Sequence, residues 1–162
     1  MAVRKAASQT VVGLSDVIDV TLTAVAEALS DNDVIAAPQE VAGFFRYPGG
    51  TVWLHSITLI DEDDQAQDVE LVFLNATGSI GNEGAAYAPA DAVLRTILGT
   101  VLISASDYSD ASNGQTATKP NVGLLLKAAE SSSSVWIAAV CRSGTPTYSA
   151  SGLRLKISVS WD

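Results

Sequence analysis

Few side chains of this protein have the types and spacing that catalysis requires. Its 162 residues include one histidine, His55, and one cysteine, Cys141. No motif places His55 with a serine and an aspartate, and no nucleophile elbow occurs. Cupin-type chemistry is disfavoured too, because it relies on several histidines and a glutamate as metal ligands. We interpret His55 as a packed, hydrogen-bonded strand residue and Cys141 as a small core residue, and we predict that the protein is not an enzyme.

Candidate metal ligands lie in the acidic segment Asp61, Glu62, Asp63, Asp64 and Gln65. Ca²⁺ takes about six to eight oxygen ligands from flexible loops, so Asp61, Asp63 and Asp64 are its candidate ligands. Their spacing matches no EF-hand or repeat loop, and a solvated acidic turn is therefore favoured. The same interpretation applies to Asp107 and Asp110. The sequence predicts no cofactor.

Charge and hydropathy exclude two classes of partner. Nine Lys and Arg residues against eighteen Asp and Glu residues give a net charge of −9, which repels phosphate backbones and disfavours nucleic-acid binding. The longest apolar run, Val135 to Cys141, is far shorter than the roughly 20 residues of a membrane-spanning helix. The apolar stretch after Arg4 and Lys5 is interrupted by Ser15, Asp16 and Asp19, so we expect a product that is not secreted.

Alternating apolar residues predict strands along most of the chain. The clearest is Leu153 to Trp161, in which every second residue is apolar. Thr51 to Ile60 and Val69 to Asn75 are interpreted as a hairpin around the acidic turn. Further strands are expected at Val17 to Ala26, Thr96 to Ser104, Asn121 to Ala128 and Ser134 to Arg142, with Ser106 to Thr116 as a loop and Pro89 to Leu98 as a short helix.

These elements predict an all-β fold, a jelly roll or β-sandwich of about eight antiparallel strands with at most one short helix. A single domain is expected over residues 11–162, preceded by an extended N-terminal arm over residues 1–10. Trp53, Trp136 and Trp161 alternate with the apolar side of their strands, so core packing is expected for them. Phe44, Phe45 and Tyr47 stand before the turn Pro48, Gly49, Gly50 and fit either a subunit interface or the core.

Four segments carry a resemblance to a group of tailed-bacteriophage virion proteins. They are SDNDVIAAPQEV (Ser30 to Val41), LHSITLIDEDDQ (Leu54 to Gln65), SASDYSD (Ser104 to Asp110) and TYSASGLRLKI (Thr147 to Ile157). The resemblance implies a jelly-roll capsid decoration, or cement, protein that binds the outer shell of a phage head, typically as a trimer. It transfers no functional residue, because none of these segments is a catalytic or ligand motif.

The resemblance sets the expected partners. The major capsid protein and further copies of the chain in a homotrimer are the implied partners, and the capsid surface of a virion assembled in the host cytoplasm is the implied location. Arg4 and Lys5 in the arm are the candidate capsid contacts. The alternative is a receptor- or glycan-binding module of a phage tail or head fibre, since jelly rolls serve both purposes.

Overall fold

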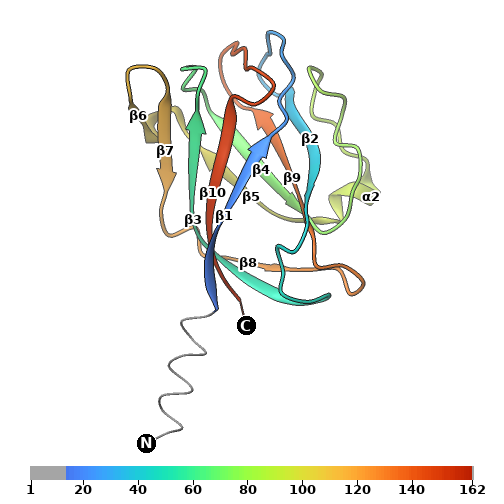
Figure 1. Cartoon of the computed structure of the whole chain (residues 1–162). Coiled ribbons are helices and arrows are strands. Elements are labelled where there is room, and N and C mark those ends of the chain that lie inside the picture. Colours follow the sequence, from blue (N-terminus) through green and yellow to red (C-terminus); the bar gives the residue numbers. More distant parts are fainter. Residues whose placement is uncertain (1–13, 162) are drawn as a thin grey trace, which may run out of the picture.

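The computed structural model describes residues 14–161, which form two facing antiparallel sheets (Figure 1). The elements in chain order are β1 (Ser15–Leu22), β2 (Val34–Val41), β3 (Thr51–Asp61), β4 (Val69–Leu74), α2 (Asp91–Leu94), β5 (Ile97–Ile103), the 3₁₀ turn η1 (Ala105–Asp107), β6 (Tyr108–Asp110), β7 (Gln115–Lys119), β8 (Leu124–Lys127), β9 (Val135–Cys141) and β10 (Leu153–Trp161). No helix in this range is long and apolar enough to cross a membrane.

The strand order is that of a jelly roll. One sheet has the order β1-β10-β3-β7-β6, with β8 also paired to β3, and the other has the order β2-β9-β4-β5. The first strand therefore pairs with the last, β2 with β9, and β4 with β5, as in an antiparallel ribbon wrapped around a core. The predicted fold class is confirmed. The structure has ten strands where about eight were expected, because β2, β6 and β7 were not recognised as strands.

A β-bulge at His55 divides β3 into two halves. Ser158 of β10 pairs with Ser56 and Val159 pairs with Leu54, which leaves His55 as the extra residue. The bulge reverses the alternation, so that Val52 and Leu54 face the core in the first half and Ile57 and Leu59 face it in the second. The neighbour of β3 changes at the same point. β8 pairs with residues 51–54 and β7 with residues 57–61.

The predicted hairpin between β3 and β4 is wrong. β3 belongs to the sheet of β1 and β10, whereas β4 pairs with β5 and β9 in the other sheet. The acidic segment is therefore a crossing between sheets. Adjacency in sequence suggested the pairing, but β4 is buried on both faces and fits only the centre of the second sheet.

The remaining differences concern short elements. The helix is four residues long, because Ile97 already pairs with Leu74 in the sheet and Thr96 donates its hydroxyl to the carbonyl of Val93. The segment expected as a loop, Ser106 to Thr116, contains β6 and the start of β7. These pieces are three to five residues long and mostly polar, so hydrophobic periodicity does not detect them.

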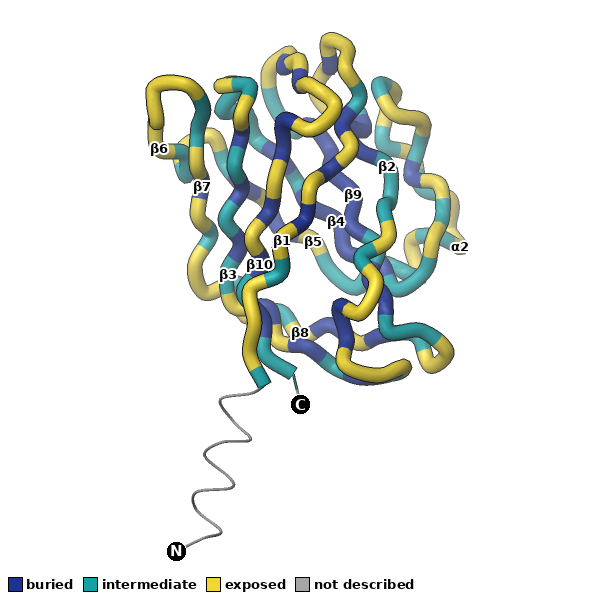
Figure 2. Tube along the Cα trace, in the orientation of Figure 1, coloured by how far each residue is buried: buried dark blue, intermediate teal, exposed yellow. Residues whose placement is uncertain are grey.

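The two sheets differ in how their outer faces are covered. The main core lies between the sheets. A second cluster lies outside the β2-β9-β4-β5 sheet, where Tyr87 and Val93 from the β4–β5 connection, together with Ile97 of β5, pack on Val72, Leu74 and their neighbours. Figure 2 shows the result: β4 and β9 are mostly buried, β10 alternates between buried and exposed residues, and β1 is mostly exposed apart from Val20 and Leu22. Among residues 14–161, only the β1-β10-β3 sheet turns an uncovered face outward.

The ends of the sandwich carry different segments. β1 begins where β10 ends, and the amide of Trp161 donates to the carbonyl of Leu14. We call this the terminal end; the segment 42–50, β8 and the segment 128–134 also lie there (Figure 1). The opposite end, the loop end, carries the segments 23–33, 62–68 and 142–152.

Candidate interaction surface

The acidic segment is organised around one buried carboxylate. The side chain of Asp61 has no solvent exposure. Its Oδ1 accepts the backbone N–H of Asp63 at 3.0 Å, and its Oδ2 accepts the N–H groups of Gln65 and Ala66 at 2.8 Å each. Three charge-assisted hydrogen bonds thus fold the chain back at the point where it leaves one sheet for the other.

The other two candidate calcium ligands, Asp63 and Asp64, accept hydrogen bonds from different residues. Asp63 Oδ2 accepts the N–H and the hydroxyl of Ser149 at 2.8 and 3.0 Å, and Asp64 Oδ1 accepts the amide of Gln115 at 2.6 Å. Within residues 14–161, no group of three or more His, Cys, Asp or Glu side chains is arranged to hold a metal ion. The structure therefore gives the three aspartates distinct structural contacts and does not bring them together around one point.

His55 and Cys141 lie on different sheets. His55 Nε2 is 2.8 Å from the hydroxyl of Ser160, so the expected hydrogen bond is present, but the side chain is exposed and the expected packing is wrong. The bulge is the reason, because it turns Ile57 inward and leaves His55 outward. Cys141 is a buried core residue, as predicted, and burial raises the pKa of its thiol.

Two further aspartates have separate roles at the edge of the sandwich. Asp107 forms an ion pair with Lys119 at 2.9 Å and accepts the N–H of Ser104, and these bonds lower the pKa of its carboxyl. Asp110 accepts the N–H of Ser112 at 2.8 Å. Both are local structural contacts.

The tryptophans do not share one environment. Trp161 donates its indole N–H to the carbonyl of Phe44 at 2.8 Å, and Trp136 packs against the second cluster. Trp53 is 42% exposed, so the expectation that it belongs to the core is wrong. It lies on the half of β3 before the bulge, where the core-facing positions are Val52 and Leu54.

Trp53 is part of a group of exposed side chains that we call the ribbon patch: Arg46, Tyr47, Trp53, Leu125 and Lys127. Trp53 stands directly opposite Leu125 in the β3–β8 pair, and Lys127 lies two residues further along β8 on the same face. Arg46 and Tyr47 belong to the segment 42–50 that leads into β3, and the tyrosine ring lies against Gly50, where an added Cβ would be 3.2 Å from it. Tyr47 and Leu125 are 52% and 48% exposed. The sequence allowed either a core position or a subunit interface for Phe44, Phe45 and Tyr47. Phe44 and Phe45 are buried in the core, whereas Tyr47 is exposed.

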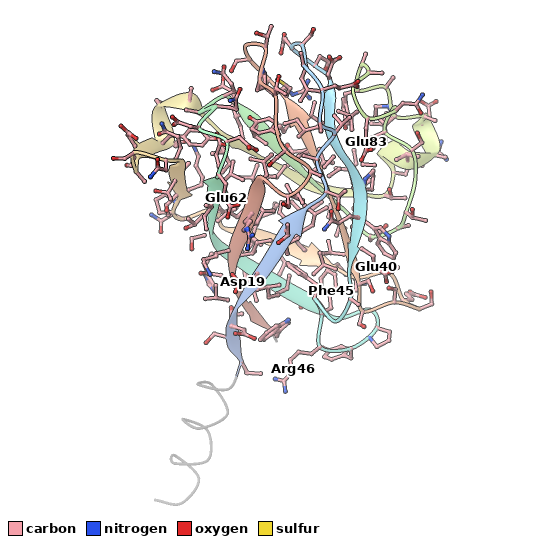
Figure 3. All side chains as sticks on the ribbon, turned by 45° about the horizontal axis from the view of Figure 1, so that its top comes forward. Asp19, Glu40, Phe45, Arg46, Glu62 and Glu83 are labelled. Carbon is pink, nitrogen blue, oxygen red and sulfur yellow. The ribbon has the colours of Figure 1, made fainter. Side chains whose placement is uncertain are left out.

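The cations of the ribbon patch form no ion pair with the described part of the chain. Seven of the nine lysines and arginines lie in the described residues, and four of these form ion pairs: Lys119, Arg142, Arg154 and Lys156. The three without an ion pair in residues 14–161 are Arg46, Arg95 and Lys127. In Figure 3, Arg46 points away from the body at the terminal end.

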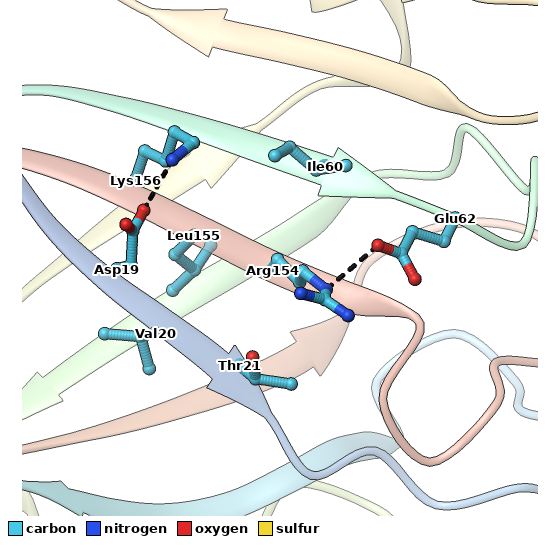
Figure 4. A pocket seen from close by; sticks show the side chains of 8 residues that line it. All are labelled: Asp19, Val20, Thr21, Ile60, Glu62, Arg154, Leu155 and Lys156. Carbon is cyan, nitrogen blue, oxygen red and sulfur yellow. Dashed lines mark hydrogen bonds and ion pairs between the residues drawn. The ribbon is translucent and has the colours of Figure 1, made fainter.

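A hollow on the same open sheet is different in character (Figure 4). It lies toward the loop end, between β1, β10 and β3. Its cations are already neutralised, since Lys156 bonds Asp19 at 2.7 Å and Arg154 bonds Glu62 at 2.9 Å. This hollow offers a ligand no unpaired charge.

The candidate capsid contacts Arg4 and Lys5 lie outside the described residues. The chain enters the described part at Leu14, at the terminal end. The sequence interpretation missed the ribbon patch. The sequence feature that could have revealed it is a break in the alternation of apolar residues within TVWLHSITLI. Val52 and Leu54 are at even positions, whereas the next apolar residues, Ile57 and Leu59, are at odd positions.

Comparisons with known proteins extend the description of the fold only. No family model and no curated protein matches the chain. Among solved structures, tomato aspermy virus is similar at 7% identity and a TM-score of 0.40, over 91% of this chain and 75% of that one. Desmodium yellow mottle tymovirus follows at 14% identity and 0.33, over 92% and 80%. An adhesin domain of Lys-gingipain from Porphyromonas gingivalis has 12% identity and 0.34, over 89% and 73%. All three TM-scores are low, and the jelly-roll assignment rests on the strand order of the two sheets.

Replacing Asp61 by asparagine should destabilise the protein. Asp61→Asn keeps the shape but substitutes an amide N–H₂ for an oxygen that accepts backbone N–H groups, so the free energy of unfolding should fall by about 2 kcal/mol. Asp64→Asn is the matched control, because Asp64 is exposed and its single contact survives in the amide; it should change stability by under about 0.5 kcal/mol. Urea unfolding measures both, and equal effects would contradict the assigned role of Asp61.

Proposed function

We propose that this protein is a structural component of a virion that binds the outer surface of a tailed-phage capsid and stabilises the shell, as a trimer. The observation that carries the proposal is how the segments that resemble phage virion proteins lie in space. Two of the four are bonded to each other at the loop end, where Ser149 donates its N–H to Asp63 and Thr147 donates its N–H to Gln65; Leu29, just before the first segment, donates its N–H to the carbonyl of Pro146, just before the fourth. The resemblance thus covers residues that build one architecture.

The body fits the physical demands of cementing. A cement protein needs a rigid scaffold with exposed contact surfaces, and the two packed sheets provide one. By linkage, a protein that binds the assembled lattice and not its disrupted form stabilises the lattice by the free energy of binding. Many identical sites multiply that effect, so each contact can be modest. A stable contact requires roughly 1,000 Å² of buried surface or more.

A second candidate is the receptor- or glycan-binding module of a tail or head fibre. The exposed side chain of Trp53 favours it, because sugar rings stack on exposed aromatic faces. The two candidates differ in stoichiometry. A decoration protein is present in proportion to the capsid subunit, whereas a fibre protein is present in few copies.

Quantitative mass spectrometry of purified virions tests the proposal through the copy number of this chain relative to the major capsid protein. On the order of hundreds of copies, in fixed ratio to the capsid subunit, are expected if the chain occupies symmetry-related positions on the shell. A few copies per particle would favour the fibre candidate. Absence from the particle would reject both.

The N-terminal arm is the second element of the proposal. Removing residues 1–10 deletes Arg4 and Lys5, and we expect occupancy on shells to fall because two cations that meet an acidic partner are lost. The matched control is the double variant Arg4→Gln with Lys5→Gln, which removes the charges but keeps the length. Co-sedimentation with shells measures occupancy, and urea unfolding verifies that the fold is intact. Unchanged occupancy in both variants would remove the arm from the capsid contact.

A further inference from the structure

We infer that the ribbon patch is the surface that docks this protein onto the shell, and that its partner is an acidic protein surface with an apolar centre on the capsid subunit. This inference rests on the proposed function and identifies the face and the chemistry of the contact. Its first ground is position. The patch lies on the outer face and rim of the β1-β10-β3 sheet, which no other element of residues 14–161 covers, at the terminal end, where the described part of the chain begins.

The composition of the ribbon patch matches the centre of an interface. Tryptophan, tyrosine and arginine dominate the binding energy of protein contacts, and the apolar residues are adjacent here. Trp53 and Leu125 are direct cross-strand partners, whose Cβ atoms lie about 5 Å apart in this geometry. Each leaves more than two fifths of its surface in water, so covering them would release water from a continuous apolar area.

The unpaired cations define the charge of the partner. In a chain of net charge −9, Arg46 and Lys127 form no ion pair within residues 14–161, so a partner carboxylate can bind them without breaking an ion pair of this part of the chain. The paired cations of the same sheet, Arg154 and Lys156, would first have to leave Glu62 and Asp19. Complementary charge at the rim then fixes orientation and speeds association.

The same charges disfavour a two-fold contact between two copies of this chain. In a two-fold contact each patch meets itself, which would set Arg46 and Lys127 against the equivalent cations of the other copy. Like charges opposed across an interface cost binding free energy. An acidic surface on a different protein avoids this repulsion, and the capsid subunit is the proposed partner.

Two pairs of variants test the inference by co-sedimentation with shells that lack this protein. Leu125→Ser and Lys127→Glu alter the ribbon patch. Leu102→Ser and Arg95→Glu are matched controls elsewhere on the surface, since Leu102 is 46% exposed on β5 and Arg95 is also unpaired. We expect the concentration for half-occupancy to rise at least about tenfold for each patch variant and less than about twofold for each control. Added salt should weaken binding of the unaltered chain more than that of Lys127→Glu.

The outcomes separate the two claims. If the unaltered chain binds shells and the patch variants bind within about twofold of it, the inference is overturned while the proposed function stands. Sedimentation velocity of the free protein covers the alternative occupant: if the patch variants change self-association and leave shell binding intact, the patch is a contact between copies and the inference is wrong. If the unaltered chain does not bind shells, the proposed function fails and the inference with it. Urea unfolding of all four variants verifies that they are folded.

Discussion

The β-bulge at His55 is the constraint on which the arrangement of this protein depends. Side chains alternate along a strand with a period of two, so one extra residue exchanges the inner and outer faces of everything beyond it. β3 lies in the middle of its sheet and pairs with β10, β7 and β8. Because of the bulge, the side chains of Leu54 and Ile57 both reach the core although their spacing in the sequence is odd. The strand that pairs with β3 also changes there from β8 to β7. Trp53 faces outward for the same reason.

Much of the fold followed from the sequence where alternation was strict. β10, with its nine alternating residues, was predicted to its ends, and β9 and β4 differed by one residue at each boundary or less. Pairing could not be predicted in the same way. β3 and β4 are neighbours in sequence and were read as a hairpin, yet the wrapping of the ribbon places them in different sheets. The buried carboxylate of Asp61 makes that crossing possible by satisfying three backbone N–H groups in a tight loop.

The candidate surface could not be predicted from residue types alone. Trp53 and His55 were both expected to be packed, and that expectation fails because the bulge leaves both side chains outward. Whether Arg46 and Lys127 are paired depends on neighbours far apart in sequence, such as the contact of the segment 42–50 with the segment 128–134 that follows β8. The β4–β5 connection, which covers one sheet and leaves the other open, has little periodicity of its own. Tertiary contacts therefore decide which apolar residues remain exposed.

These features make the two ends of the molecule structurally different. At the loop end, acidic segments are tied to one another through Asp61, Asp63 and Ser149, which makes this end a closed structural unit. At the terminal end, exposed aromatic and aliphatic side chains stand beside unpaired cations. Electron cryomicroscopy of the intact virion tests the account most directly, because it shows which end meets the shell. The account predicts the jelly roll on the outer surface, with the terminal end inward and Trp53 and Leu125 in contact with the capsid subunit. A molecule bound through its loop end, or one found only in the tail, would contradict it.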